Sequence, residues 1–436
     1  MKRLIPSLTA LAVACAAPPV IAQSAAPQSS AVQSGAVQAR SAPPCEGAAG
    51  YSAVFEGRRT FLWRPDWLTT IKGRLGDDPS LQPAWSALKD RADAALERAP
   101  YSVVDKTMTP ASGDKHDYMS MGPYWWPDRS KPNGLPYVRR DGQFNPERET
   151  SAFDVTRLEA MSQDVQALAL ANYFTGDARY AAKAGELIRV WFLNPATRMN
   201  PNFNHGQAVP GRVSGRAEGV IDAHRLARVI EAAGLLLPTD ALTRDENEAL
   251  QDWFGELVQW MATSPIGREE RAADNNHGLY YDTLITHFAL FAGLEDVAQA
   301  VAERAKTRRL AAQIDPDGSL PKELTRTRSL HYTTWTLTAA FDLADEARCV
   351  GVDLWNYRSE DGRSLHGAAE FVAAYAGRET EWRWPELNKS ETDGIYEVLQ
   401  RAAWAWNDPS FADKAALYAE RNAGMSLNLR VPPYAR

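Results

Sequence analysis

The chain has 436 residues, of which 44% are hydrophobic and 24% are charged, and its formal net charge is -7. This is an ordinary globular composition, and the chain is long enough to bury a sizeable core. The acidic balance argues against a nucleic-acid-binding protein, which needs a basic surface. An anionic substrate would therefore require a locally basic cleft in an acidic protein.

The N-terminus has the features of an export signal. Residues 1–3 include two positively charged side chains, and an apolar run extends from Leu4 to Cys15. A small residue, Ala22, immediately precedes Gln23. The run is too short to span a bilayer, so we expect a cleavable signal peptide over residues 1–22 and no membrane partner. Residues 23–49 are rich in Ala, Ser, Gln and Pro, which predicts a disordered linker. The mature protein is expected to be secreted or periplasmic.

The rest of the chain, residues 50–436, is predicted to form a single all-α domain. Residues 157–177 and 178–195 both have apolar residues at helical spacing, and they end at Gly176 and before Pro195, which indicates an αα-hairpin. Similar patterns occupy residues 218–236, 244–263, 294–314, 333–349, 366–377 and 394–406. A strict repeat of about 34 or 40 residues is not visible, which disfavours a regular solenoid and favours a closed (α/α) toroid.

Polar, Gly- and Pro-containing segments interrupt the helical pattern at residues 114–147, 200–219, 271–282 and 315–335. Long loops inside a compact domain usually carry function, and in a toroid they line a cleft. The seven histidines are scattered, and neither a zinc-binding motif nor a Gly-rich phosphate loop is present. A glycoside hydrolase needs two carboxylates on either side of a cleft, and the spacing of the acidic residues in this chain identifies no such pair. We therefore expect neither a metal nor an organic cofactor.

The segment around residues 326–332 has the composition of a general-base site. Arg328 and Tyr332 are four residues apart and would share one helical face, with Arg326 half a turn earlier. A free tyrosine has a pKa of about 10, and nearby guanidinium charge should lower it. Seven Lys or Arg residues against three acids between Arg304 and Arg328 make a basic patch. The alternative is that the arginines pair with acids and Tyr332 packs in the core.

The run "RAADNNHGLYYD", residues 271–282, brings an amide and an imidazole together at Asn276 and His277. Such donors suit β-elimination of a uronic acid, in which the C5 proton beside a carboxylate is removed. The carboxylate must be neutralised first, and the developing enediolate needs the same donors. The alternative is a capping or turn residue at Asn276 and a structural histidine at His277.

Several motifs carry a resemblance to a known group of enzymes. The "NNH" run followed by "DGSLPKEL" and "RTRSLHY" resembles the alginate-lyase-like polysaccharide lyases. "YMSMGPYWWPD", "GLPYVRRDGQFNPE" and "YAAKAGELIRVWFLNPATRMNPN" are closer to polysaccharide lyase family 38, which contains glucuronan and alginate lyases. The resemblance covers about residues 100–345, and it implies an (α/α) toroid and a metal-independent lyase.

The resemblance also implies roles for single residues. The family's carboxylate-neutralising pair corresponds to Asn276 and His277, its catalytic tyrosine to Tyr332 and its arginine to Arg326. Family 5 alginate lyases have "YHxY" where this chain reads "YTTW", so Trp335 replaces the second tyrosine and a family 5 assignment is disfavoured. The expected substrate contacts are Arg328, Arg216, Gln207, His205, His116, Tyr118, Tyr124, Trp125, Trp126 and Tyr281.

The stereochemistry of the uronates suggests a substrate. In D-mannuronate and D-glucuronate the C5 proton and the C4 oxygen lie on one side, so one tyrosine can serve as base and then as acid in a syn elimination. L-guluronate needs an acid and a base on opposite faces, although His277 as a second base would broaden the specificity. We therefore expect a lyase that cleaves a 1,4-linked D-uronate polymer, and β-1,4-glucuronan is the substrate that we favour. The alternatives are a mannuronate-preferring alginate lyase, a non-catalytic binder of acidic polysaccharide and, more weakly, a glycoside hydrolase.

The two cysteines that would remain after removal of the signal peptide are Cys45 and Cys349. In an exported protein they can form a disulfide, because the compartment is oxidising. Two free thiols, with Cys349 buried, are the alternative.

Overall fold

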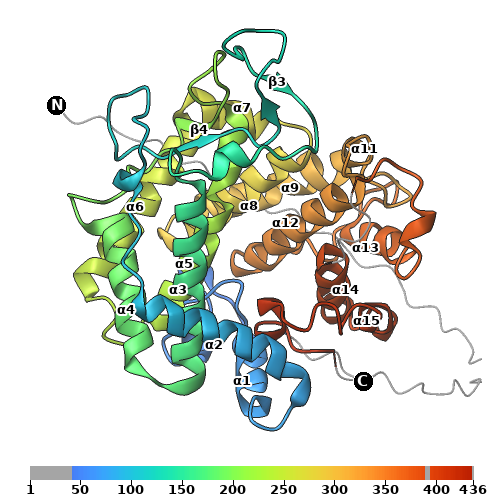
Figure 1. Ribbon diagram of the computed structural model, residues 1–436. Helices are drawn as coiled ribbons and strands as arrows, with labels where there is room; N and C mark the ends of the chain where they lie inside the picture. Colours follow the sequence, from blue (N-terminus) through green and yellow to red (C-terminus); the bar gives the residue numbers. More distant parts are fainter. Residues whose placement is uncertain (1–41, 388–392, 435–436) are drawn as a thin grey trace, which may run out of the picture. The chain divides into compact units, whose positions relative to one another are not determined.

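The computed structural model describes residues 42–387 and 393–434 (Figure 1). The predicted signal peptide, residues 1–22, and most of the predicted linker lie outside this part of the chain. The prediction of a disordered linker is wrong for residues 42–49. These residues belong to the compact unit that begins at Ala42, and they include a short 3₁₀ helix, Gly47–Ala49. In the parts that the structure describes, no helix has the length and apolar character needed to cross a membrane.

Helices dominate this unit, as the apolar periodicity predicts. The helices are α1 Pro65–Arg74, α2 Gln82–Glu97, α3 Val155–Thr175, α4 Ala178–Ile188, α5 Leu226–Leu236, α6 Arg244–Thr263, α7 Pro265–Ala272, α8 Asn276–Phe291, α9 Glu295–Ala305, α10 Ala311–Gln313, α11 Pro321–Leu324, α12 Ser329–Cys349, α13 Leu365–Ala373, α14 Asp393–Trp406 and α15 Pro409–Ala416. The strands are β1 Met119–Met121, β2 Trp125–Trp126, β3 Val138–Arg139 and β4 His205–Ala208.

The hairpin of α3 and α4 confirms the predicted αα-turn. Gly176 follows α3 with a φ of 75°, a left-handed conformation that glycine adopts without steric cost. Asp177 then caps α4, because its side chain accepts a hydrogen bond from the backbone N–H of Arg179 at 2.9 Å. Two local signals, a glycine stop and an aspartate cap, therefore define the turn.

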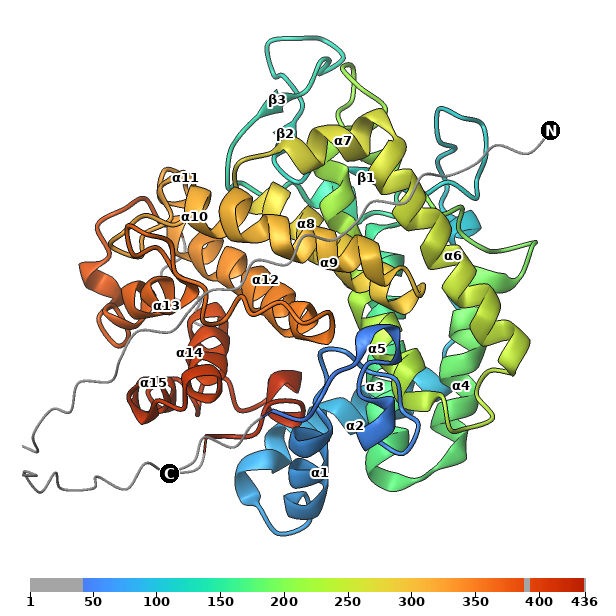
Figure 2. The ribbon, with the colours of Figure 1, turned by 180° about the vertical axis from the view of Figure 1, so that it is seen from behind.

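The helices form an (α/α) toroid, which confirms the predicted fold. Every residue of α8 except His277 is buried, as expected for a helix with apolar contacts on all sides. Helices α3, α5, α8, α12 and α14 surround the middle of the unit, while α4, α6 and α9 lie on the outside (Figures 1 and 2). The N-terminal ends of α8 and α12 point toward the loops that contain strands β1 to β4.

Two short strand pairs organise those loops. β1 pairs with β4 in parallel, and β2 pairs with β3 in antiparallel register, with Trp125 opposite Arg139. Beneath β1, the buried carboxylate of Asp222 accepts hydrogen bonds from Tyr118 at 3.0 Å and Ser120 at 2.5 Å. This buried acceptor fixes the start of the β1–β3 segment against the helical body.

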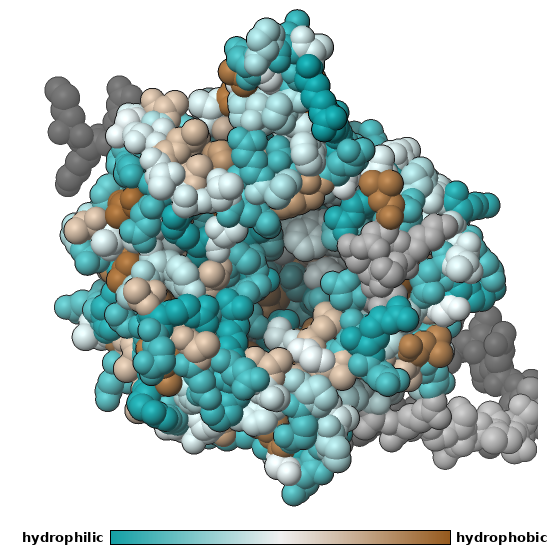
Figure 3. All heavy atoms as spheres, in the orientation of Figure 1, coloured by the Kyte–Doolittle hydropathy of each residue, from teal (hydrophilic) through white to brown (hydrophobic). Residues whose placement is uncertain are grey.

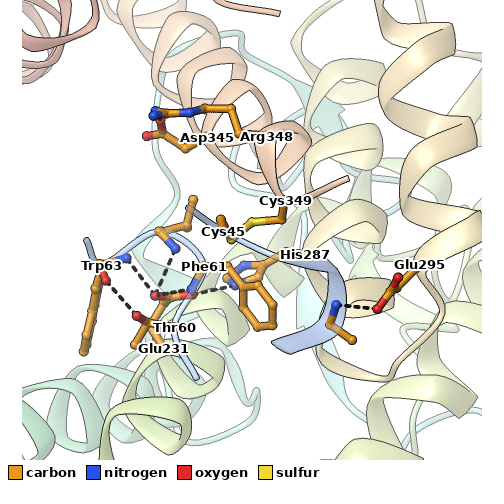
Figure 4. The surroundings of a disulfide bond; sticks show 12 residues. Cys45, Thr60, Phe61, Trp63, Glu231, His287, Glu295, Asp345, Arg348 and Cys349 are labelled. Carbon is orange, nitrogen blue, oxygen red and sulfur yellow. Dashed lines mark hydrogen bonds and ion pairs between the residues drawn. A yellow bond between two sulfur atoms is a disulfide. The ribbon is translucent and has the colours of Figure 1, made fainter. Parts of the chain in front are cut away.

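A disulfide joins the N-terminal segment of the unit to the last residue of α12, which resolves the alternative left open by the sequence. Cys45 and Cys349 are bonded, with 4.5 Å between their Cα atoms and 304 positions between them in sequence (Figure 4). Close by, the Glu231 carboxylate accepts the backbone N–H groups of Phe61 at 3.1 Å and Trp63 at 2.9 Å. The N-terminal segment is thereby attached to α12 covalently and to α5 by hydrogen bonds.

We expect the double substitution Cys45→Ser and Cys349→Ser to lower the free energy of unfolding by about 2–5 kcal/mol, because a long loop is no longer closed in the unfolded chain. Urea unfolding of the variant and of the wild-type protein, each with and without reductant, measures the loss. The reduced wild-type protein should approach the variant, and the variant itself should not respond to reductant. Equal unfolding midpoints for all samples would show that this crosslink contributes no stability.

Candidate active site

A cavity of about 490 Å³ lies where the N-terminal ends of α8 and α12 meet the loop that carries β2 and β3. Its walls include these residues expected from the sequence: Tyr124, Trp125, Gln207, Arg216, Asn276, His277, Arg326 and Tyr332. They come from segments far apart in the chain, so the toroid brings the "NNH" and "RTRSLHY" motifs to one place.

Tyr332 lies in the first turn of α12, with only 8% of its surface exposed. Its hydroxyl is 2.6 Å from the hydroxyl of Tyr124, so the cavity contains two hydrogen-bonded phenols. The Arg326 guanidinium lies 3.8 Å from the centroid of the Tyr332 ring, a cation–π arrangement over the ring face. The sequence correctly predicted that Arg326 is near Tyr332. The guanidinium group lies over the face of the ring, however, and not beside the hydroxyl oxygen.

The expected direction of the Tyr332 pKa is corrected by the structure. Burial raises the pKa of Tyr332 above its ordinary value, and this outweighs the lowering by Arg326. The positive charge of Arg326 is also shared with Asp141, at 2.9 Å from Nη2 to Oδ1 and 3.2 Å from Nε to Oδ2. Although burial opposes it, the hydrogen bonds and charge of Arg326 lower the pKa of Asp141 to about 2. Tyr332 is therefore a neutral phenol in the unliganded cavity.

His277 is paired with a buried acid that the sequence motif did not reveal. Its Nδ1 is 2.7 Å from Oε1 of Glu270, which is 2% exposed. Burial alone would lower the pKa of His277, but the charge and hydrogen bond of Glu270 outweigh it and raise this pKa. A protonated imidazole has a second N–H to donate, so His277 can offer both a charge and a hydrogen bond to an anion.

Asn276 is hydrogen-bonded to a second buried acid. Glu323 accepts its backbone N–H at 2.7 Å and its Nδ2 at 2.8 Å. The side-chain amide nitrogen has two hydrogens, so one remains for a ligand. Within the described residues the Oδ1 atom of Asn276 has no hydrogen-bond partner. Asn276 is thus oriented by Glu323 in a buried wall of the cavity.

Arg216 and Gln207 also line the cavity. Arg216 donates from Nη2 to Oε1 of Gln207 at 2.7 Å, and its Nη1 is 2.5 Å from Glu218. Gln207 has a φ of 48°, in the left-handed region that non-glycine residues rarely adopt. Such backbone strain is characteristic of positions that hold a ligand-facing group. Trp125 lies beside Arg216, with 5.9 Å between the guanidinium carbon and the ring centroid.

Two tyrosines expected to contact sugar lie in the core. Tyr118 is fully buried, and its hydroxyl donates to Asp222 at 3.0 Å. Tyr281 is also buried, and its hydroxyl donates to the carbonyl oxygen of Met261 at 3.1 Å. Both phenols already have structural partners, and neither lines the cavity. The expected substrate contacts at these two residues are therefore not supported.

The remaining expected contacts also lie away from the cavity walls. The His116 ring bonds the carbonyl of Arg198 at 2.6 Å, and Trp126 donates to the carbonyl of Gln143 at 2.9 Å. His205 is buried in β4, with its Nε2 3.7 Å from Asp117. Arg328 precedes α12 and forms a backbone bridge with Glu386. These side chains belong to the framework of the loops.

The structure adds acids around the cavity whose role pattern analysis missed. Asp141, Glu270 and Glu323 each bind a predicted site residue, yet each is distant in sequence or lies across a helix break from its partner. Asp141 and Glu323 lie inside quoted motifs, but neither motif indicated their partners. His331 and Trp335 also line the cavity, with rings nearly parallel and 6.1 Å apart. Among the residues described, no group of three or more His, Cys, Asp or Glu side chains is placed to hold a metal ion.

Comparisons with known proteins identify a group of relatives. The alginate lyase family model matches residues 102–382. An alginate lyase from Bacteroides ovatus has a similar crystal structure, with 40% identity and a TM-score of 0.82 over 86% of this chain and 100% of that one. Alginate lyase A1-III from Sphingomonas species A1 shares the fold, at 18% identity and a TM-score of 0.52 over 84% and 99% of the two chains. No curated protein matched.

The substitution Glu270→Gln should lower the pKa of His277, because the negative charge that stabilises the imidazolium is removed while the shape is kept. An NMR titration of the histidine ring protons measures this pKa, and a His277→Asn variant assigns the signal. Glu370→Gln, which removes the acid beside His366 on α13, is the control and should leave the His277 titration unchanged. An unchanged His277 pKa would mean that Glu270 does not control its charge.

Proposed function

Because the chain belongs to the alginate lyase family, we propose that it cleaves a 1,4-linked D-uronate polymer by syn β-elimination, with β-1,4-glucuronan as its substrate. It is a polysaccharide lyase that acts on alginate-like uronates. The observation that supports the finer proposal is that Tyr332, Asn276 and His277 line one cavity. A uronate carboxylate bound by Asn276 and His277 would place the adjacent C5 atom within reach of the Tyr332 hydroxyl.

The proposed reaction begins with neutralisation of the substrate carboxylate. Protonated His277 and the free amide hydrogen of Asn276 donate to it, and they continue to donate as the enediolate develops. Arg216 serves a neighbouring carboxylate of the polymer. Because Glu270 and Glu323 orient these donors before substrate arrives, little reorganisation is needed during the reaction.

Tyr332 then transfers one proton twice. After its own proton has passed to solvent, Tyr332 takes the C5 proton as a phenolate, and the electron pair of the C–H bond moves into the enediolate. The C4–O4 bond breaks, a C4–C5 double bond forms, and Tyr332 returns the proton to O4. Tyr124 lies within hydrogen-bond distance of the phenolate, and the Arg326 charge over the ring favours this form against the burial that raises the pKa of Tyr332. Both transfers occur on one face of the sugar, which fits D-glucuronate and D-mannuronate.

A mannuronate-preferring alginate lyase is the second candidate. It is favoured by the family model and by the 40% identical relative, both of which carry the name alginate lyase. We also propose that the protein is exported, since a disulfide between Cys45 and Cys349 is stable in an oxidising compartment.

The activity is tested by mixing the protein with glucuronan, polymannuronate and polyguluronate in the presence of a chelator. Elimination creates a conjugated double bond, so near-ultraviolet absorbance should rise most with glucuronan. A faster rise with polymannuronate would favour the second candidate. Reducing ends without absorbance would indicate hydrolysis, and binding without either signal would contradict the enzyme proposal. Tyr332→Phe should lower turnover by roughly 10²–10⁴-fold with binding retained, whereas Tyr281→Phe, a buried tyrosine outside the cavity, should remain active.

The substitution Asp141→Asn should lower kcat by roughly 10–100-fold with a smaller change in KM, because Arg326 is no longer held over Tyr332. Steady-state kinetics on the preferred uronan measures both constants. Asp128→Asn is the matched control, since Asp128 lies in the same loop but only bonds Ser130 locally. If Asp141→Asn has the wild-type kcat, the ion pair with Arg326 is not needed for the reaction.

A further inference from the structure

The catalytic cavity, the space of about 490 Å³ beside Tyr332, has acids as well as cations in its walls. The charged wall residues are the cations Arg139, Arg216, His277 and Arg326 and the acids Glu218, Glu269 and Glu270. The face shown in Figure 3 is mainly hydrophilic and is hollowed at its centre, so a polymer that approaches this face meets mostly polar groups. An acid in a cavity that binds a polyanion opposes the binding by charge repulsion, and its presence therefore requires an explanation.

Glu218 is the acid that contacts Arg216. Nη1 of Arg216 is 2.5 Å from Oε1 of Glu218. Burial lowers the pKa of Arg216, and the charge of Glu218 opposes this shift. Burial also lowers the pKa of His277, whereas the charges of Glu270 and, to a smaller extent, Glu218 raise it. The Glu218 carboxylate therefore acts on two of the cations that the proposed mechanism assigns to substrate carboxylates.

Arg216 has a fixed orientation without Glu218. Its Nε donates to the backbone carbonyl of Gln207 at 3.0 Å, and its Nη2 donates to Oε1 of the same residue at 2.7 Å. Gln207 is buried, so it holds two of the three guanidinium nitrogens in place. Glu218 contacts the third nitrogen, Nη1, which is where an incoming carboxylate would bind.

Glu218 differs in exposure from the acids that hold the other donors. Glu270 and Glu323 are each 2% exposed, whereas 41% of the Glu218 side chain is exposed. An ion pair with an exposed partner is weak, because water and salt screen it. Breaking a buried pair would instead leave a charge desolvated. A substrate carboxylate can therefore replace Glu218 at Arg216 at little cost.

The backbone on either side keeps Glu218 next to the arginine. A Cβ atom on Gly215 would lie 1.9 Å from the carbonyl oxygen of Asn204, and one on Gly219 would lie 2.3 Å from the carbonyl carbon of Gly206. Such close approaches fix the path of the main chain through this segment. Release of the arginine therefore requires only a rotation of the Glu218 side chain.

We propose that Glu218 occupies the position of a substrate carboxylate at Arg216 and competes with the polymer for it. This inference rests on the proposed function, in which Arg216 binds a carboxylate of the polymer. Glu218 then determines specificity, because a uronate at this position displaces it, whereas a neutral sugar leaves the ion pair intact and gains nothing from Arg216. The alternative is that Glu218 positions Arg216, and the two interpretations predict opposite changes in affinity when its charge is removed.

The test uses Glu218→Gln, which keeps the shape of the side chain and removes its charge. Calorimetry in the inactive Tyr332→Phe background measures the binding of tetrasaccharides from glucuronan and polymannuronate. We expect Glu218→Gln to bind them roughly threefold to tenfold more tightly, as fits a partly exposed charge contact. Since Glu218 is exposed and Gln has the same size, the variant should fold like the wild-type protein.

Glu269→Gln is the matched control, since it removes the same charge from the cavity wall and leaves the ion pair of Arg216 with Glu218 intact. Equal tightening by both substitutions would overturn the inference, because the effect would then come from the net charge of the cavity. In an Arg216→Gln background, Glu218→Gln should act no more strongly than Glu269→Gln, since the contested cation is gone. A larger effect in that background would also contradict the competition.

Weaker binding by Glu218→Gln would overturn the inference and make Glu218 a positioning residue for Arg216. The proposed activity is judged separately, by the absorbance assay. Uronan cleavage by the wild-type protein together with an unchanged affinity in Glu218→Gln would overturn the inference alone. Tighter binding by Glu218→Gln in a protein that cleaves no uronan would contradict the proposed activity and leave the competition at Arg216 standing.

Discussion

The ion pair between Arg326 and Asp141 holds the catalytic cavity together. Asp141 belongs to the loop over the cavity and Arg326 precedes α12, so one contact joins two parts of the chain 185 positions apart. Thr327 also donates to Asp141, and Gly142 approaches it so closely that a Cβ atom would lie 2.4 Å from the Thr327 hydroxyl. The same loop carries Tyr124 to Tyr332. Without this attachment, Tyr332 would lose both its hydrogen bond to Tyr124 and the cation over its ring.

Three acids have a common task around this cavity. Glu270 raises the pKa of His277, Glu323 orients Asn276 and Asp141 positions Arg326. Each acid holds a side chain that lines the cavity, so the cavity offers hydrogen bonds and positive charge to an anion although the protein as a whole is acidic. Preorganised donors of this kind stabilise a developing negative charge more effectively than donors that must move.

The interior of the toroid is unusually polar for a core. Glu231, His287 and Glu346 are all buried inside it, where unpaired polar groups are costly. The disulfide and the hydrogen bonds of Glu231 fasten the N-terminal segment to α12 and α5, which supports this interior from one end.

The sequence by itself determined the helical class and identified three residues that line one cavity. Apolar spacing and the stop at Gly176 are local, and "NNH" and "RTRSLHY" contain Asn276, His277 and Tyr332 within short motifs. Only the tertiary structure decided which acids support them, because Glu270 and Asp141 reach their partners through folding and not through spacing. It also placed Tyr118 and Tyr281 in the core and raised the pKa of Tyr332, since burial depends on every element packed around a side chain.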